Sequence, residues 1–483
     1  MDPQTPAHSQ SQPQSQSQGK SSAHWKQGDR IEITITDLSA EGEGVGRLGD
    51  EVGGPVVFVP DSVPGDRAVV RLLKVKRQYA KGQIETLLEA SPQRVRPSCI
   101  VADKCGGCQW QTLDYDYQVQ AKEDQVRQAL QRVGHFADPP LEPILAAAQP
   151  LGYRNKSTYP LALSSTGQVQ AGYYRKGSHK LVNLNQCPVQ DDRLDRLLAE
   201  VKQDIQDQGW SIYDEAQHSG SLRHLSLRIG RRTGEQLIAL VSTTWNLPGL
   251  EEQAQAWLER YPNLVGVALN HNPGQTNVIF GPESRCVAGR DYLEEQFGGL
   301  RFQVRSDTFF QIYTEQAEAL LNIIADELQL QGNEVVLDAY CGVGTLALPL
   351  AKSCRIMIGI EVQPEAIAQA EVNAHLNDIT NSQFWIGTVE EVLPQWKGRL
   401  TVMPDVVLLD PPRKGCDRRV LEELLYLEPP RIVYVSCKPA TLARDLKILC
   451  DSGRYRLKRV RSADFFPQTP HVETVAFLER ITP

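Results

Sequence analysis

The fold of this chain is decided by a short apolar stretch near its C-terminus, RIVYVSCKP at residues 431–439. Its β-branched and aromatic residues are typical of a strand that is buried on both faces. Cys437 stands where this strand should end, two residues before Pro439. In open α/β sheets ligands bind beyond the carboxyl ends of the strands, so a thiol at this point would face a ligand. Most buried cysteines are inert, however, so the neighbouring segments have to decide.

Two further segments place polar residues next to predicted strands. PDVVLLDPPRKG at residues 404–415 is a second buried strand, which ends in Asp410 and two prolines. DFFPQTPHVET at residues 464–474 carries Glu473 beside the last apolar run of the chain. Together with Cys437, these signals predict a single site at one edge of a sheet.

Helices and strands alternate regularly after residue 300. A helix is predicted over 313–330, strands over 334–338 and 356–360, and a helix over 364–377, with later strands near residues 384, 406, 432 and 475. Such alternation is typical of a doubly wound parallel sheet. We therefore expect an α/β domain at residues 301–483.

The rest of the chain divides into three segments. Residues 1–24 are mostly Gln, Ser and Pro, a composition that predicts a disordered tail. Residues 25–90 contain five short apolar runs separated by glycine turns, which predict a small β-barrel. Residues 91–300 mix strands and helices irregularly, so a central α+β domain is expected there.

Composition limits the classes of partner. The formal net charge of −8 provides no global positive field, so nucleic acid binding would need a local basic patch. Such a patch is predicted where basic residues outnumber acids, although a solvated strand face remains the alternative: Arg67, Arg71, Lys74, Lys76, Arg77, Lys81, Arg94 and Arg96. The segments YRNK (153–156) and YYRK (173–176) interleave aromatic and basic residues, as single-stranded RNA contacts do. No apolar run suits a membrane span or a secretory leader, so a soluble cytoplasmic monomer is expected.

A glycine turn predicts the cofactor site. VVLDAYCGVGTLA at residues 335–347 reads as a strand, a glycine turn and a helix, and Glu361 after the next strand suits a ribose. This pattern also fits a dinucleotide such as NAD. An acid immediately before the turn, Asp338, would repel a pyrophosphate but would attract an ammonium group, which favours S-adenosylmethionine.

Four cysteines form a candidate metal site. Cys99, Cys105 and Cys108 have the spacing C-x5-C-x2-C, and Cys187 stands before a proline. Four thiolates can hold zinc or an iron-sulfur cluster, and the spacing does not separate these two.

At this point the motifs resemble those of a known family, the RNA uracil-5-methyltransferases that use S-adenosylmethionine. The segments that carry the resemblance are FFQ (309–311), 338–345, 410–415, 435–439 and HVE (471–473). The four cysteines and the glycine-rich N-terminal domain resemble the ribosomal RNA branch, which has a TRAM domain and a four-iron four-sulfur cluster. The resemblance implies a class I methyltransferase fold and methylation of a uridine at C5 in 23S ribosomal RNA.

The resemblance also implies a role for each matched residue. Cys437 would add to C6 of uracil, and Glu473 would be the base that removes the C5 proton. Phe309 or Phe310 would stack on a flipped base, unless both are core aromatics. The implied cluster ligands are Cys99, Cys105, Cys108 and Cys187. The implied cofactor contacts are Gln311, Tyr340, Gly342, Gly344, Thr345, Glu361 and Asp410.

Other functions remain open from the sequence. A transfer RNA uracil-5-methyltransferase would need the same catalytic residues, and a non-catalytic RNA-binding or ribosome-assembly factor would keep the fold without turnover. A radical S-adenosylmethionine enzyme would have three residues in the first cysteine gap, where this chain has five. An adenine N6-methyltransferase would have no use for a cysteine nucleophile.

Overall fold

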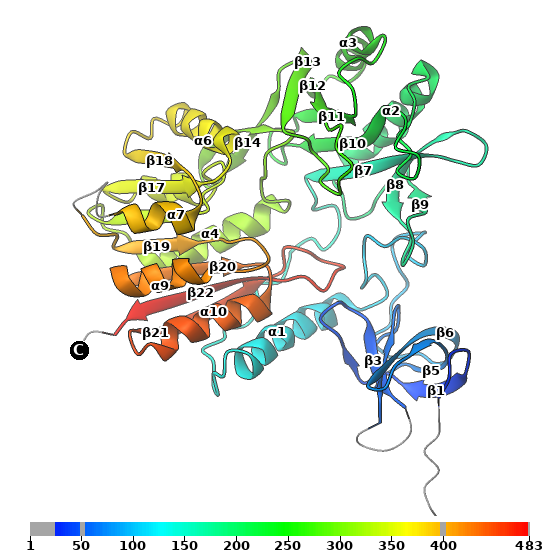
Figure 1. The fold of residues 1–483 in the computed structure, drawn as a ribbon, viewed down its shortest axis with the longest axis horizontal. Helices are drawn as coiled ribbons and strands as arrows, with labels where there is room; N and C mark the ends of the chain where they lie inside the picture. The colour runs from blue at the N-terminus through cyan, green and yellow to red at the C-terminus, as the bar shows by residue number, and fades with distance from the viewer. Residues whose placement is uncertain (1–24, 49–53, 397–401, 482–483) are drawn as a thin grey trace, which may run out of the picture.

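The computed structural model describes residues 25–48, 54–396 and 402–481. Three bodies are arranged around a common centre: an N-terminal β-domain, a central domain and a C-terminal α/β domain (Figure 1). The predicted disordered tail, residues 1–24, lies outside the described residues.

The N-terminal β-domain consists of one six-stranded sheet in the order β1-β5-β6-β4-β3-β2. Its strands are β1 (Arg30–Thr34), β2 (Asp37–Leu38), β3 (Gly44–Arg47), β4 (Val56–Val59), β5 (Arg67–Val75) and β6 (Tyr79–Glu89). Two backbone hydrogen bonds directly after β1 connect both halves of the sheet. Ile35 donates to the carbonyl of Asp66, just before β5, and Thr36 donates to the carbonyl of Val45 in β3. Alternate residues such as Ile31 and Ile33 point into the core, as period-2 strands require. The structure thus adds the two-residue strand β2 to the five that were predicted.

The central domain is built on a seven-stranded sheet in the order β13-β12-β11-β10-β7-β8-β9. Its strands are β7 (Lys156–Leu163), β8 (Val169–Tyr174), β9 (Leu181–Asn183), β10 (Leu222–Ile229), β11 (Gln236–Ser242), β12 (Leu264–His271) and β13 (Glu283–Gly289). Helices α2 (Asp195–Gln208) and α3 (Leu250–Arg260) share one hydrophobic core with this sheet. The predicted α+β character is therefore observed.

The C-terminal domain contains a second seven-stranded sheet, in the order β18-β17-β16-β19-β20-β22-β21. Its strands are β16 (Val335–Ala339), β17 (Ile356–Glu361), β18 (Ser382–Ile386), β19 (Val406–Leu409), β20 (Arg431–Ser436), β21 (Tyr455–Ala463) and β22 (Glu473–Arg480). The first five strands in this order are parallel, whereas β22 runs antiparallel to both of its neighbours. An antiparallel strand begins where the parallel strands end, so the first residue of β22 lies at their carboxyl edge.

Helices cover both faces of this sheet. They are α4 (Thr314–Leu328), α5 (Ala347–Ala351), α6 (Pro364–Leu376), α7 (Val389–Val392), α9 (Arg418–Leu427) and α10 (Pro439–Asp451). Neighbouring strand residues belong to two separate cores, since Val336 packs in one and Val335 and Leu337 pack in the other. This is the predicted doubly wound arrangement, with an antiparallel pair of strands at one end.

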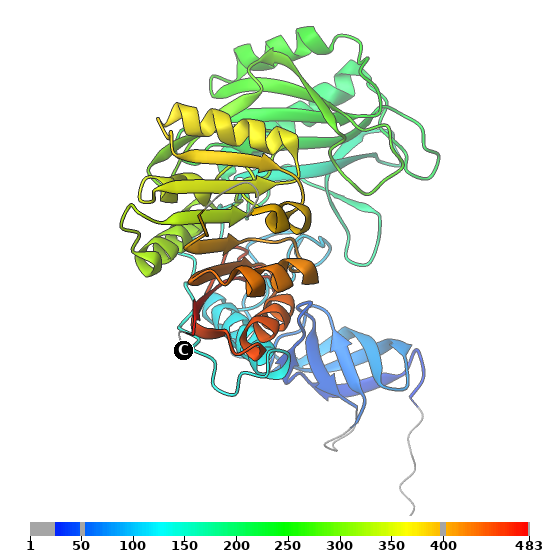
Figure 2. The same cartoon turned by 60° about the vertical axis from the view of Figure 1, so that its left-hand side comes forward.

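Two elements cross the predicted boundary at residue 300. The hairpin β14 (Tyr292–Phe297) and β15 (Leu300–Arg305) packs in the core of the C-terminal domain. Helix α1 (Tyr115–Arg132) packs against α10, with Val126 buried in the same core as α10 (Figure 2). Both elements bury their apolar residues against the C-terminal sheet.

A buried ion pair fixes α1 in this position. Lys122 Nζ lies 2.6 Å from Asp464 Oδ1, and neither side chain is exposed. Lys122 also donates to the carbonyl of Phe466, and Gln118 exchanges hydrogen bonds with Gln468. Helix α1 therefore holds the segment that leads into Glu473. Among the described residues, no helix combines the length and the hydropathy needed to cross a membrane.

Candidate functional site

The ends of β20 and β22 bring Cys437 and Glu473 together. Ser436 is paired with Thr474 across the two antiparallel strands, so the residues that flank this pair are neighbours. Cys437 is half-buried and Glu473 is 5% exposed. The predicted nucleophile and base, 36 positions apart in the sequence, thus lie at one edge of the sheet.

The Cys437 thiol responds to three charged neighbours. Burial raises its pKa, and the carboxylates of Glu473 and Asp410 raise it further, whereas Arg413 lowers it by charge and by a hydrogen bond. The thiol is therefore protonated in the free protein at neutral pH, and Arg413 is the group that favours the thiolate. Arg413 was not among the predicted site residues, although it belongs to the DPPRKG segment that predicted Asp410.

Burial raises the pKa of both carboxyl groups of this edge, and Asp410 also acts on the pKa of Glu473. Burial raises the pKa of Asp410 to about 7. The pKa of Glu473 is raised well above its ordinary value, first by burial and then by Asp410, while Arg413 opposes this rise. A carboxylate with a raised pKa holds a proton more strongly, which suits a general base.

A buried hydrogen-bond network holds the loop at residues 410–417, which follows β19. The backbone N–H of Cys416 lies 3.2 Å from the Tyr434 hydroxyl oxygen and 3.0 Å from Asp445 Oδ2. Tyr434 donates to the same carboxylate at 2.6 Å, and Arg444 donates to its other oxygen. This network holds the loop that carries Asp410 and Arg413.

The glycine turn after β16 has the backbone that the sequence predicts. Gly342 and Gly344 have φ values of 54° and 87°, in the region that favours glycine. A Cβ on Gly342 would meet no atom within 4 Å, so this side of the turn is open. Glu361 accepts a hydrogen bond from the backbone N–H of Gly342 at 3.2 Å, and Thr345 is half-buried in the same turn.

Tyr340 differs from the expectation. Its φ of 95° is unusual for a residue with a side chain. The pKa of its phenol is raised by burial and by Cys416, with which the hydroxyl forms a hydrogen bond. The phenol thus faces the loop below the turn, and a contact between this side chain and the cofactor remains a prediction.

Asp338 is a buried acid of the site whose carboxylate lacks hydrogen bonds to the described residues. It is 1% exposed, and neither carboxylate oxygen has a hydrogen-bond partner within the described part of the chain. Burial, Asp410 and Glu361 together raise its pKa to about 8. Buried carboxyl groups without partners are costly, so three acids around one turn indicate a site for a cationic ligand. S-adenosylmethionine, with its sulfonium and ammonium groups, fits these residues.

The segment 309–311 separates two aromatic residues that the sequence left equivalent. Phe310 is 4% exposed and packs edge-on against Phe297 and Phe302, so it belongs to the core. Phe309 is 68% exposed, which leaves its ring available for a base. The backbone carbonyl of Gln311 accepts a hydrogen bond from Asn155, and its side-chain amide makes none within the described residues.

The prediction that residues 153–156 form an RNA-contacting surface is wrong. Tyr153 is 1% exposed and donates to the carbonyl of Pro467. Asn155 is 3% exposed, and Lys156 donates to the carbonyl of Ser306 at 2.8 Å. This segment is largely buried and connects two loops of the candidate site, one at Pro467 and one at Ser306. Its polar groups form hydrogen bonds within the protein.

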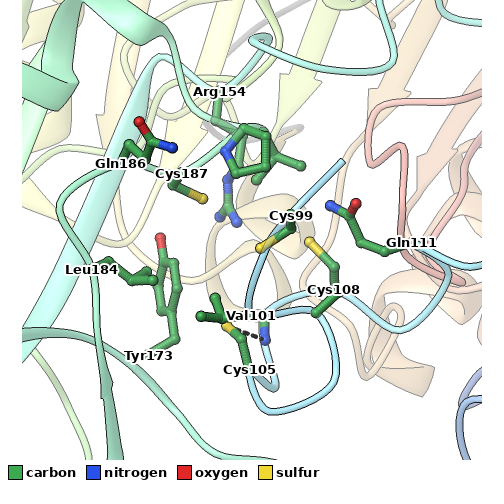
Figure 3. Close-up of a pocket in the computed structure, with 14 residues that line it drawn as sticks. Cys99, Val101, Cys105, Cys108, Gln111, Arg154, Tyr173, Leu184, Gln186 and Cys187 are labelled. Atoms are coloured by element: carbon green, nitrogen blue, oxygen red, sulfur yellow. Dashed lines mark hydrogen bonds between the residues drawn. The ribbon is translucent and has the colours of Figure 1, made fainter. Parts of the chain in front are cut away.

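The four predicted metal-binding cysteines do meet, around one cavity (Figure 3). Cys99, Cys105 and Cys108 come from one loop and Cys187 from another, and all four are free thiols. Burial raises the pKa of Cys108 to about 12, and the nearby thiols contribute to this rise. Yet no three His, Cys, Asp or Glu side chains of the described residues are arranged to hold one metal ion.

Arg154 also points into this cavity (Figure 3). Its buried Nε has no hydrogen-bond partner within the described residues. The charges of the Cys108 and Cys187 thiolates would favour its cationic form. An unpaired guanidinium beside four thiols fits a negatively charged group in the cavity.

The predicted basic face of the N-terminal domain is partly neutralised. Arg67 pairs with Glu32 and Glu89, and Arg71 pairs with Glu85. Lys81 and Arg94 likewise pair with acids. Within the described residues, four of the eight predicted cations have no ion pair, and three of these lie near the turn between β5 and β6: Lys74, Lys76, Arg77 and Arg96.

Family models identify two parts of the chain. The model described as "tRNA (Uracil-5-)-methyltransferase" matches residues 276–481, and the model described as "TRAM domain" matches residues 24–84. The first match begins before β14, in agreement with the packing of the hairpin on the C-terminal domain.

Whole-length relatives carry consistent names. An uncharacterized RNA methyltransferase of Nostoc is 64% identical over 94% of this chain and 97% of its own length. One from Synechocystis is 56% identical over 95% and 98%, and one from Bacillus cereus is 39% identical over 93% and 96%.

A solved structure covers nearly the whole chain as well. It is the Pyrococcus abyssi tRNA (uracil-54, C5)-methyltransferase in complex with S-adenosyl-L-homocysteine, which is 28% identical. The similarity has a TM-score of 0.72 and covers 93% of this chain and 100% of that one.

Proposed function

The chain belongs to the S-adenosylmethionine-dependent RNA uracil-5-methyltransferases, and from this premise we propose that it methylates C5 of a uridine in 23S ribosomal RNA through a covalent adduct with Cys437. The observation that carries this proposal is the meeting of Cys437, Glu473, Asp410 and Arg413 at one strand edge. We also propose that the protein acts as a monomer in the cytoplasm.

Cys437 begins the reaction in this proposal. Its thiolate forms a bond to C6 of uracil, and the electrons of the C5–C6 double bond move onto C5 and the neighbouring carbonyl. Arg413 stabilises the thiolate before the addition, since it lowers the pKa of Cys437. When bound, S-adenosylmethionine would supply the methyl group: a bond forms between this methyl and the electron-rich C5, the bond from sulfur to the methyl breaks, and S-adenosylhomocysteine leaves.

Glu473 completes the reaction. Its carboxylate takes the C5 proton, the C5–C6 double bond forms again, and the bond between C6 and the Cys437 sulfur breaks. The sulfur leaves as a thiolate and takes up a proton in place of the one that the thiol lost before the addition. Glu473 then releases the C5 proton, so the protein regains its starting state. The raised pKa of Glu473 supports this role.

The acids around the glycine turn would orient the cofactor. Asp338 and Glu361 suit the ammonium and the ribose, and the open side of Gly342 allows close approach of the ligand. Asp410 raises the pKa of both Asp338 and Glu473, so it lies between the cofactor region and the base. Gln311, Gly344 and Thr345 remain proposed cofactor contacts.

The four-cysteine cavity would hold a four-iron four-sulfur cluster. Cys99, Cys105, Cys108 and Cys187 are the proposed ligands, with a structural role. The four thiols meet around one cavity, and the resemblance to the ribosomal RNA branch favours an iron-sulfur cluster over zinc. The unpaired Arg154 would balance its negative charge.

Transfer RNA is the second candidate substrate. The Pyrococcus abyssi relative is a tRNA (uracil-54, C5)-methyltransferase, and the match to it covers 93% of this chain. We favour ribosomal RNA because the four cysteines and the N-terminal domain resemble the ribosomal RNA branch, although the match to the Pyrococcus abyssi structure takes in this part of the chain too.

One experiment separates these substrates. Ribosomal and transfer RNA from cells with and without the gene are digested, and 5-methyluridine is mapped by mass spectrometry. Loss at a 23S position would support the full proposal, whereas loss in transfer RNA would keep the chemistry and replace the substrate. No loss in either RNA would contradict the proposal.

A further inference from the structure

The central domain has a groove that takes no part in the candidate active site. It lies beside the end of β7, has a volume of about 620 Å³, and continues along the loop at residues 212–216. Ligand sites in proteins usually have volumes of about 300–1,000 Å³. We call it the Tyr174 groove, and the lining residues that matter here are Tyr174, His179, Tyr213, Glu215, Arg223 and His224.

Flat side chains form part of its walls. Tyr174 and His179 pack edge to face, with 5.8 Å between their ring centroids. The guanidinium of Arg223 lies 4.8 Å from the centroid of the Tyr213 ring. Aromatic rings and guanidinium planes are the surfaces on which unpaired nucleobases stack.

Two buried nitrogen atoms of the groove have no partner within the described residues. Arg223 is 5% exposed and donates to the carbonyls of Asn272, Gly274 and Thr276, but its Nε makes no hydrogen bond. The Nδ1 atom of His224 is likewise unpaired. Burial lowers the pKa of His224 to about 4, so at neutral pH its ring offers one donor and one acceptor. Unpaired buried polar atoms in a groove indicate a polar ligand.

The charge of the groove favours a base over a phosphate. The carboxylates of Asp214 and Glu215 outnumber the single cation Arg223. A carboxylate accepts hydrogen bonds, and guanine is the base that presents two adjacent donors, N1–H and the N2 amino group, to one carboxylate.

Phosphates would find cations in the adjoining groove. That second groove has a volume of about 640 Å³, lies between the N-terminal and central domains, and shares Tyr174 with the first. Arg175 lines it with no ion pair among the described residues, whereas Lys81 and Lys176 are paired there with Glu43 and Asp61. A nucleotide in the Tyr174 groove would thus continue toward the TRAM domain.

We propose that the Tyr174 groove binds an unpaired guanine of the RNA and thereby selects the RNA at a point distant from the target uridine. The base stacks on Tyr174 and Tyr213, and Glu215 accepts hydrogen bonds from its Watson–Crick edge. The inference rests on the proposed function only in that the ligand is the substrate RNA.

The test compares two labelled oligonucleotides by fluorescence anisotropy with the full-length protein and no cofactor. One is a short oligouridine, and the other is the same oligomer with one central guanine. We expect the guanine oligomer to bind about tenfold more tightly, as one bidentate contact between a carboxylate and a base edge allows. Equal affinities for the two oligomers would overturn the proposal.

Variants identify the groove. Glu215→Gln keeps the shape of an exposed side chain but removes one acceptor, so the guanine preference should fall while oligouridine affinity stays the same. Tyr213→Ala should remove the preference. Tyr426→Ala, an exposed tyrosine on α9, is the matched control and should retain it. A preference that survives both Glu215→Gln and Tyr213→Ala would place the guanine elsewhere.

A Cys437→Ala protein keeps this test independent of catalysis. If it binds the guanine oligomer like wild type, the groove acts in binding alone, as we propose. If the methylation proposal fails while the preference remains, only the identity of the RNA has to be revised.

Discussion

The proposed catalytic edge, which is the end of β20 and the start of β22 with Cys437 and Glu473, differs from the four-cysteine cavity in how it is built. We call this pair of strand ends the catalytic edge. Cys437 and Glu473 stand on adjacent strands whose register is fixed by a continuous ladder of backbone hydrogen bonds. The cysteines lie on loops, and their side chains meet only around a cavity. A sheet can hold reacting groups in place by itself, whereas loops of this kind depend on what they bind. Changes that destroy the cavity should therefore leave the structure of the catalytic edge intact. Changes at the catalytic edge, by contrast, should abolish activity even when the cavity is intact.

The strongest test of the catalytic edge is Cys437→Ala. We expect methyl transfer to fall by about 10⁴-fold or more, since no other group can form the adduct. The melting temperature should change little, because the thiol makes few structural contacts. Turnover is measured by methyl incorporation into RNA, with Cys286→Ala as the matched exposed-thiol control. Retained turnover would exclude the nucleophile role.

Glu473→Gln tests the second half of the reaction. The methylated adduct should form but not resolve, so turnover should fall by about 10²–10⁴-fold. A covalent complex of protein and RNA should then appear on a denaturing gel. Glu479→Gln, at the other end of β22, should give wild-type turnover. The absence of any trapped complex would contradict the assignment of Glu473 as base.

Cys108→Ala should affect the cavity and leave the sheet edge in place. Protein purified without oxygen should be brown and contain about four iron atoms per chain, and the variant should lose colour and iron. Its loops should exchange amide hydrogens faster than those of wild type, while the exchange of β20 and β22 stays slow. Cys450→Ala is the control. A colourless wild-type protein that contains zinc would reject the iron-sulfur cluster.

Asp338 links the catalytic edge to pH. The pKa of its carboxyl is about 8 in the folded protein and near 4 when unfolded, so the folded state binds more protons between these values. The free energy of unfolding without cofactor should therefore fall as pH rises from about 4 to about 8. Asp338→Asn should remove much of this slope and stabilise the protein at pH 8 by up to roughly 5 kcal/mol.

Urea unfolding at pH 5 and pH 8 measures this effect. Asp326→Asn, an exposed acid on α4, should leave the slope unchanged. The free energy of unfolding of wild type could instead rise from pH 5 to pH 8 and be unaffected by Asp338→Asn. That result would show that the Asp338 carboxylate has a partner in the folded protein.

The smallest effect concerns the N-terminal domain. Replacing Lys74, Lys76 and Arg77 with Gln should weaken RNA binding by about tenfold and reduce the dependence of log K on log salt by about two. Arg67→Gln and Arg71→Gln should matter less, because their charges are already paired with acids. If both groups of variants lost RNA affinity equally, RNA phosphates would displace the acids that pair with Arg67 and Arg71.

The sequence predicts that Cys437 and Asp410 lie at a sheet edge, because strand ends leave a clear signal. A buried apolar run that stops at Cys437 or Asp410 marks the edge of a parallel sheet. The apolar run beside Glu473 also placed this residue at the predicted site, but the sequence did not reveal that β22 runs antiparallel or that Glu473 would be the base. The resemblance to a known family supplied this role.

Burial of polar residues was harder to predict. The aromatic and basic pattern of Tyr153 and Lys156 suggested an exposed surface, but loops distant in sequence cover it. Phe309 and Phe310 are chemically equal, and only packing against β14 and β15 separates them. The pairing of Arg71 with Glu85 follows from the register of β5 and β6, which the charge pattern did not contain.

The ion pair between Lys122 and Asp464 has a consequence for the order in which this protein is made. The two residues are 342 positions apart, so α1 leaves the ribosome roughly half a minute before its partner is synthesised. During this interval the apolar face of α1 has no sheet to cover, and the segment that leads into Glu473 does not yet exist. The N-terminal and central domains can therefore fold first, and the catalytic edge is completed only when almost the whole chain has been translated.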